Sequence, residues 1–381
     1  KINLTFYTNI PTPYQLDFFE ALSERFNLRV VYYALNESNR MWEIEQNILS
    51  YPVLVLKDSV LIKPLLKRIV SFHFSWEIFR AVWFDPSEVV IFGGSYNCPN
   101  TVLGLFLSKI RKKRIGFFSE KLYPSKSRRD HIIKKIMLYP LKRSCQFLIC
   151  VGQASVESYT KFNFEQKKIV IPYNISTDRF KRENLIQEKY EDLLLKLKTG
   201  IDYLMLSSGA LIKRKGMDTL IKVITELDTT YKIKLIILGD GEDKNKLEKL
   251  IGNSDRVELV GFKQKEEIPY YYAIADIFLF ATKYDGWGLV INEALAASLP
   301  VISSAQCVAA KELVKEGKNG FLCDADDIHA FKTSLIKLIN DPTSIQKIIE
   351  NNEKLGESIS SYSMSSKLHS FLSDFIRVKN V

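Results

Sequence analysis

The chain has 381 residues, of which 46% are hydrophobic and 26% are charged, and its net charge is +10. This composition excludes a disordered chain, and the length is more than one hydrophobic core usually serves, so we expect two domains. The five cysteines are odd in number and lack C-x-x-C spacing, so we expect reduced thiols in a cytosolic protein. We expect no signal peptide, no membrane-spanning segment and no metal site, because apolar runs are short and the four histidines are scattered.

Strand-like and helix-like segments alternate along the whole chain. The first half contains five strand candidates: INLTFYT from residue 2, LRVVYYAL from 28, SEVVIFGG from 87, KRIGFFSE from 113 and FLICVG from 147. Such alternation predicts parallel sheets built from βαβ units. Residues 181–200 are charged and helix-prone, and we expect them to connect the two halves.

The second half contains several strand-like segments that each end in a glycine turn, most of them followed by a helix-like segment. The segment SSGALIKRKGMDTLIKVI begins at residue 207, KIKLIILGDGEDKNKLEKL at 232 and VELVGF at 257. The strand IFLF from 277 then leads into YDGWGLVINEALAASLPVISS, which contains a tight turn, an Ala-rich helix and a further strand. A turn of this kind directs backbone N–H groups and the positive end of a helix to one point, which suits a phosphate.

Asp285 and Glu293 lie eight residues apart in the last of these segments. Eight residues span about 800° of an ideal helix, so both carboxylates can face one cleft. A strand–helix unit without a functional site can carry the same spacing.

Several of these motifs, in this order, resemble glycosyltransferase family 4, the retaining enzymes of GT-B fold, over residues 170–330. Asp285 and Glu293 resemble its E-x7-E signature, with Asp in the first position. The segment from 207 is similar to G-x-L-x-x-x-KG-x-x-x-LI, which holds the donor diphosphate. The arginine expected after the glycine is Ala210 here, and Lys213 and Arg214 are the possible substitutes.

The resemblance implies an α/β fold of two Rossmann-like domains that face each other across a cleft. Residues 1–178 would form the acceptor domain and 200–355 the nucleotide-sugar donor domain. Residues 356–381 would form a C-terminal helix that returns to the first domain.

The resemblance also assigns roles to individual residues. Lys215 would stabilise the charge that develops on the β-phosphate, Glu293 would bind the ribose hydroxyls and Asp285 would face the donor sugar. The other donor-binding positions lie in turns that follow strands: Gly209, Phe262, Gly288, Leu289 and Val290.

Three further features depart from the family or remain open. Glu120 ends the strand IGFFSE, near where many family members carry a histidine, and could orient the acceptor or contact the sugar. It could equally be a strand-end carboxylate paired with Lys121 or Arg128. The first loop carries IPTPY where many family members have glycines that contact the donor or acceptor. The acidic pair in Asp324–Asp326 is expected to cap a helix rather than bind a metal.

The positive charge is concentrated in residues 61–145, with 17 Lys and Arg against 5 Asp and Glu, a net charge of +12. These charges alternate with apolar and aromatic residues. We expect this segment to lie on an anionic membrane surface. A solvated basic face and a nucleic-acid site are the alternatives, although no nucleic-acid-binding motif accompanies the charge.

The sequence therefore predicts a retaining, metal-independent glycosyltransferase of the hexosyltransferase type, without a cofactor. It would move a sugar from UDP or GDP to a lipid-linked saccharide of O-antigen, capsule or exopolysaccharide, at the inner face of the cell membrane. The rival interpretations are a nucleotide-sugar epimerase of GT-B fold and a basic, non-enzymatic protein that binds membrane or nucleic acid.

Overall fold

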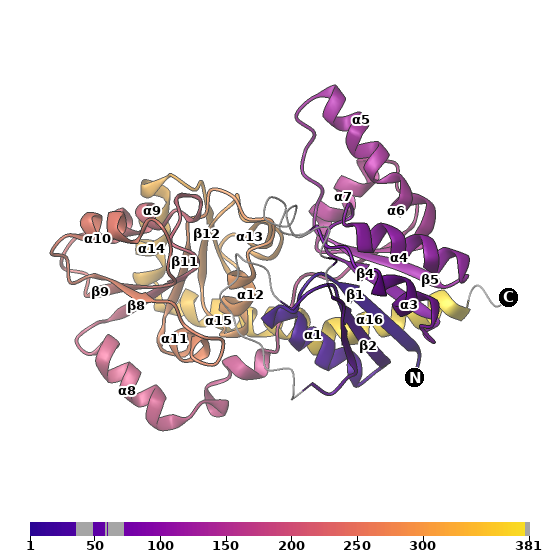
Figure 1. Cartoon of the computed structure of the whole chain (residues 1–381). Helices are drawn as coiled ribbons and strands as arrows, with labels where there is room; N and C mark the ends of the chain where they lie inside the picture. Colours follow the sequence, from indigo (N-terminus) through magenta and orange to yellow (C-terminus); the bar gives the residue numbers. More distant parts are fainter. Residues whose placement is uncertain (36–48, 58, 60–71, 378–381) are drawn as a thin grey trace. The chain divides into compact units, whose positions relative to one another are not determined.

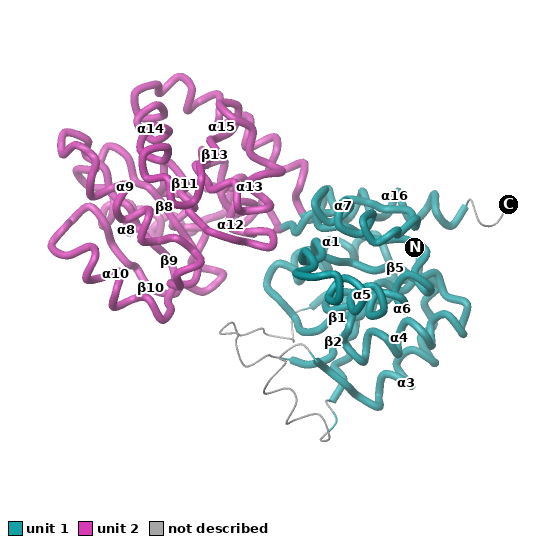
Figure 2. Tube along the Cα trace, turned by 90° about the horizontal axis from the view of Figure 1, so that it is seen from above, with its two compact units in different colours: residues 1–174, 361–381 teal, residues 175–360 magenta. Residues whose placement is uncertain are grey.

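The computed structural model describes residues 1–35, 49–57, 59 and 72–377. The chain divides into two compact units (Figure 2). Unit 1 comprises residues 1–174 together with 361–381, and unit 2 comprises residues 175–360.

Unit 1 is built on a seven-stranded parallel sheet with the order β3-β2-β1-β4-β5-β6-β7. The strands are β1 (Asn3–Thr8), β2 (Asn27–Tyr32), β3 (Val53–Val55), β4 (Val89–Gly93), β5 (Arg114–Ser119), β6 (Phe147–Cys150) and β7 (Lys167–Val170). The five strands predicted in this half are confirmed. The two edge strands, β3 and β7, escaped prediction because one has only three residues and the other begins with two lysines.

Helices cover both faces of this sheet: α1 (Pro13–Ser23), α3 (Glu77–Trp83), α4 (Pro99–Ile110), α5 (Arg128–Met137), α6 (Tyr139–Ser144), α7 (Gln153–Lys161) and α16 (Ser361–Arg377). The C-terminal helix α16 packs against α1, as Figure 1 shows. Its Phe371 and Phe375 rings lie 5.5 and 5.3 Å from the ring of Phe147 in β6. The predicted return of the C-terminal helix to the first domain is therefore confirmed.

Unit 2 is built on a six-stranded parallel sheet with the order β10-β9-β8-β11-β12-β13. Its strands are β8 (Tyr203–Ser208), β9 (Ile233–Leu238), β10 (Val257–Gly261), β11 (Ile277–Phe280), β12 (Val301–Ser304) and β13 (Gly320–Cys323). Its helices are α8 (Gln187–Lys198), α9 (Met217–Thr225), α10 (Lys244–Ile251), α11 (Ile268–Ile274), α12 (Leu289–Ala296), α13 (Val308–Leu313), α14 (Ile328–Ile339) and α15 (Pro342–Ser358). Short 3-10 helices are η3 (Thr177–Phe180), η4 (Arg182–Asn184) and η5 (Lys213–Lys215). The segment 181–200, predicted to connect the two halves, contains η4 and α8 within unit 2.

The strand order of unit 2 reverses between β8 and β11. From β8 the chain continues through β9 to β10 in one direction, and from β11 through β12 to β13 in the other. In open parallel sheets, ligands bind at such a switch point, beyond the carboxyl ends of the strands. The turns that follow β8 and β11 are therefore where a ligand of unit 2 would bind.

Within the part of the chain that the structure describes, no helix combines the length and apolar character that crossing a bilayer requires.

Candidate active site

The turns after β8 and β11 are joined by hydrogen bonds. The backbone N–H of Lys283 donates to the carbonyl of Arg214 at 2.8 Å, and the Thr282 hydroxyl donates to the same carbonyl at 3.1 Å. Between η5 and α9, Gly216 has φ +67°, and a Cβ atom there would lie 2.0 Å from the carbonyl oxygen of Ala281. Only glycine fits this close approach, which holds the basic loop against the end of β11.

Two cations converge on Asp285 at this switch point. The Lys215 ammonium donates to Asp285 Oδ2 at 2.5 Å, and these two side chains are only 14% and 16% exposed. The Arg214 guanidinium lies 3.7 Å from the same oxygen and donates to the Tyr284 carbonyl at 2.6 Å. Two positive charges therefore share one carboxylate, which leaves this cluster with a net positive charge. Of the two possible substitutes for the missing arginine, both of which are exposed, Arg214 is the one that contacts Asp285 and the Tyr284 carbonyl.

Glu293, in α12, is held by a buried tyrosine. The Tyr272 hydroxyl donates to Glu293 Oε2 at 2.8 Å. Burial raises the pKa of Tyr272 well above its usual value, and the neighbouring Glu293 charge adds to this shift. The phenol therefore stays protonated and donates throughout the neutral pH range. The sequence motifs did not identify Tyr272. The one signal in the sequence is that it belongs to the run of three tyrosines before β11.

The start of α12 is fixed by packing against Cys307. Gly288 precedes α12 with φ +94°, and a Cβ atom there would lie 2.3 Å from Cys307 Sγ. The Cys307 thiol donates to the Trp287 carbonyl at 3.1 Å, and the Trp287 indole donates to Asn292 at 2.8 Å. Leu289 opens the helix, so it and the following Val290 lie in the first turn, where N–H groups without intrahelical partners give a positive end.

Two more predicted donor-site residues lie at the same edge of the sheet. Gly209 follows β8 with φ +151°, and a Cβ atom there would lie 3.7 Å from Lys215. Phe262 follows β10 and is 41% exposed. The structure therefore brings the donor-site predictions of unit 2 to the carboxyl ends of its strands.

Glu120 is in unit 1, directly after β5. Its side chain is hydrogen-bonded to Tyr173, which is also hydrogen-bonded to Tyr14 of the IPTPY loop. Burial raises the pKa of Tyr173 well above its usual value, and Glu120 and Tyr14 add to the shift. The rings of Tyr14 and Tyr173 lie 4.8 Å apart. Glu120 thus belongs to a tyrosine cluster at the carboxyl edge of the unit 1 sheet.

The expected helix cap at Asp324–Asp326 is wrong by one residue. The cap of α14 is Asp327, whose carboxylate accepts from the N–H of Ala330 at 2.9 Å. Asp326 instead pairs with Lys283 at 2.5 Å. Among the described residues, no group of three His, Cys, Asp or Glu side chains is placed to hold a metal ion.

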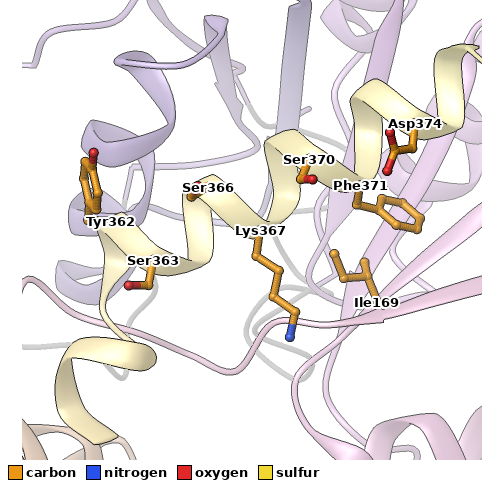
Figure 3. Close-up of a pocket in the computed structure, with 8 residues that line it drawn as sticks. All are labelled: Ile169, Tyr362, Ser363, Ser366, Lys367, Ser370, Phe371 and Asp374. Atoms are coloured by element: carbon orange, nitrogen blue, oxygen red, sulfur yellow. The ribbon is translucent and has the colours of Figure 1, made fainter. Parts of the chain in front are cut away.

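An open groove of about 590 Å³ runs along α16 in unit 1 (Figure 3). It is lined by Ile169, Tyr362, Ser363, Ser366, Lys367, Ser370, Phe371 and Asp374. None of the site residues predicted from the sequence is among them, so the groove is not part of the candidate site.

Residues 196–355 match the family model described as Glycosyl transferases group 1. This part of the chain is a group 1 glycosyltransferase domain. It lies within unit 2 and contains the cation cluster, Tyr272 and Glu293.

Two curated relatives match a longer part of the chain than the family model does. The alpha-monoglucosyldiacylglycerol synthase of Acholeplasma laidlawii is 28% identical over 55% of this chain and 54% of its own length. The N-acetylgalactosamine-N,N'-diacetylbacillosaminyl-diphospho-undecaprenol 4-alpha-N-acetylgalactosaminyltransferase of Campylobacter jejuni is 29% identical over 59% of each chain. The chain thus spans about half the length of the curated relatives it matches.

A solved structure extends the likeness of fold to the whole chain. The crystal structure of Anabaena Alr3699/HepE in complex with UDP covers 98% of this chain and 100% of that protein, with a TM-score of 0.77 and 18% identity. Together with the two parallel sheets, this confirms the expected α/β fold of GT-B type.

Proposed function

We propose that this chain is a retaining, metal-independent glycosyltransferase. It transfers a hexose from a UDP- or GDP-linked donor to a lipid-linked saccharide in the assembly of a cell-surface polysaccharide. The observation that carries the proposal is the pairing of Lys215 and Arg214 with one carboxylate, Asp285, at the switch point of a group 1 domain.

The cluster suits a nucleotide diphosphate. Its net positive charge and the N-terminal turn of α12 both attract phosphate oxygens. Glu293 can accept two hydrogen bonds from the ribose hydroxyls, and Tyr272 fixes the orientation of its carboxylate. The UDP bound to Anabaena HepE, a protein of the same fold, supports this donor class.

The chemical step breaks the bond between the anomeric carbon and the phosphate oxygen. Negative charge then grows on the β-phosphate, while the acceptor hydroxyl forms the new bond to the anomeric carbon and gives its proton to the departing phosphate oxygen. Lys215 and the N–H groups of residues 288–290 would stabilise that charge, and one preorganised donor of this kind typically contributes about 3–4 kcal/mol. Asp285 would turn to the sugar hydroxyls once the diphosphate takes over its two cations.

The acceptor proposal rests on the relatives and on the charge of unit 1. The names of the Acholeplasma and Campylobacter relatives contain a diacylglycerol and a diphospho-undecaprenol. The +12 segment, residues 61–145, would adsorb to an anionic membrane at the inner face of the cell membrane, although residues 61–71 lie outside the described part. Lys113 does not contribute to that surface, because it is buried and donates to the carbonyls of Asp85 and Ser87 at 2.6 Å.

A panel of UDP- and GDP-sugars, read by thermal shift and by nucleotide release with a lipid-linked saccharide, tests the proposal. We expect one donor to stabilise the protein and to release its nucleotide only when the acceptor is present. Conversion of the donor to its epimer would instead indicate the epimerase. Membrane or nucleic-acid binding without any response to nucleotide sugars would indicate a non-enzymatic protein.

A further inference from the structure

Helix α5 exposes every one of its ten residues at least in part. It begins after Ser127, whose hydroxyl accepts from the N–H of Asp130 at 3.1 Å, so its N-terminus is capped. On its inner side, the Lys134 ammonium donates to the Tyr123 carbonyl at 2.8 Å. None of its residues is buried. α5 is therefore a locally stabilised helix that contributes nothing to the core of unit 1.

Four of the exposed side chains of α5 are apolar. Ile132, Ile133, Ile136 and Met137 are 52%, 46%, 67% and 37% exposed. At about 100° per residue, these four positions fall on one side of the helix. The apolar stripe of a helix in a soluble protein normally faces the core, whereas this one faces outward. An exposed stripe of this kind marks a contact with something outside the chain.

The charge around the stripe identifies the chemistry of that partner. Residues 121–145 contain eight Lys and Arg against one Asp. Arg128, Arg129 and Lys135 are exposed on α5 itself, next to its isoleucines. The exposed rings of Tyr123 and Tyr139 flank the helix. Apolar residues between cations, with tyrosines at the boundary, are typical of a helix that lies in the interface of an anionic bilayer.

The neighbouring helices of unit 1 show the same chemistry. α3 turns Ile78, Ala81 and Val82 to the core, yet Trp76, directly before the helix, and Trp83, its last residue, are 63% and 42% exposed. Arg111 lies 5.5 Å over the Trp83 ring. α3 packs on α4, α4 on α6 and α6 on α5, which stands out beyond the others in Figure 1.

We propose that α5 inserts its apolar stripe into the interface of an anionic bilayer, with its basic residues on the lipid phosphates. The inference rests on the proposed transfer to a lipid-linked acceptor, and it adds hydrophobic insertion to the electrostatic adsorption of the basic segment. Adsorption alone vanishes at high salt, where screening reaches within about 3 Å, whereas inserted isoleucines keep the protein on the membrane.

Cosedimentation of the full chain with vesicles tests the insertion. The vesicles contain phosphatidylcholine alone or with phosphatidylglycerol, without any acceptor or donor, at 0.1 M and 1 M salt. The variant carries Ile132→Ser and Ile136→Ser, which leave the charge and every buried side chain unchanged. The matched control carries Leu195→Ser and Leu250→Ser, which remove two exposed leucines from unit 2.

We expect the wild type and the control to bind anionic vesicles and to keep part of that binding at 1 M salt. The Ile132→Ser, Ile136→Ser variant should lose at least about tenfold in the salt-resistant binding. Equal binding by the variant, or complete loss of wild-type binding at 1 M salt, would overturn the inference. So would a wild-type dimer in lipid-free solution that the variant converts to monomer, because the stripe would then be a protein interface.

Glycosyl transfer to a detergent-solubilised acceptor, measured with the same variant, separates this inference from the proposed function. If the variant retains both transfer and wild-type vesicle binding, only the proposed insertion of α5 is contradicted. Absence of wild-type transfer with any nucleotide sugar would remove the proposed function, whatever the vesicles show.

Discussion

The proposed donor site depends most on Lys215 and Glu293. Lys215 would neutralise charge that appears only as the anomeric bond breaks, and Glu293 would place the nucleoside. We expect Lys215→Ala and Glu293→Ala each to lower turnover by at least about 100-fold, because a preorganised donor acts mainly on the transition state. Steady-state kinetics with the donor identified in the panel measures this, and circular dichroism checks the fold. Near wild-type turnover by either folded variant would contradict the assignment.

Arg214 and its neighbour Lys213 allow a matched comparison. Both are basic residues of η5, but only Arg214 is directed at Asp285. We therefore expect Arg214→Gln to weaken the binding of a nucleoside diphosphate by about 10-fold or more, and the monophosphate much less, because charge-assisted hydrogen bonds are stronger than neutral ones. Lys213→Gln should change neither. Calorimetric titration with UDP, UMP, GDP and GMP gives the dissociation constants of the diphosphates and the monophosphates. Equal effects of the two variants on these constants would show that only net charge matters.

The sequence predicted which residues of unit 2 lie at the candidate site, but it did not predict the side chains that contact them. Asp285, Glu293 and Lys215 belong to motifs whose spacing is visible in the chain. Tyr272 lies 21 residues before the Glu293 that it holds, and Arg214 lies 71 before Asp285, so no local pattern links them. The buried position of Lys113 within the run RKKR likewise depends on the carbonyls of a distant turn.

The turn between β11 and α12 shows how an element positions the site. Gly288 requires both a positive φ and room beside Cys307 Sγ, whereas Gly200 has a similar φ of +75° with nothing within 4 Å. We expect Gly288→Ala to destabilise the fold more than Gly200→Ala, which should cost only the backbone strain of about 1–3 kcal/mol. Urea unfolding of both variants measures the difference. Equal midpoints would show that the contact with Cys307 relaxes without cost.

Elements were predictable where burial is strong. The central strands are continuous apolar runs that their neighbours cover on both faces, so they stand out in the sequence. The edge strands β3 and β7 are partly exposed and short, and only their pairing with β2 and β6 defines them. The same reason explains the cap of α14: three aspartates lie within four residues, and the turn geometry decides that Asp327 is the one that caps.

At the scale of the whole molecule, we propose that side chains and a helix terminus, rather than a metal, neutralise the charge of the donor diphosphate. Activity should therefore persist in excess EDTA, since Lys215, Arg214 and the start of α12 supply the positive charge. Transfer assays with and without EDTA, followed by addition of Mg²⁺ or Mn²⁺, check this. Complete loss that either ion restores would mean that the charge at the site has been misassigned.

The proposed activity is retaining transfer from a nucleotide-diphosphate sugar to a lipid-linked saccharide. It is tested most directly by incubating the full chain with a labelled UDP- or GDP-sugar and a lipid-linked saccharide, and by determining the anomeric configuration of the isolated product by NMR. If the protein has this activity, label enters the lipid fraction and the new linkage keeps the configuration of the donor. An inverted linkage, or no label in the lipid with any donor of the panel, would contradict it.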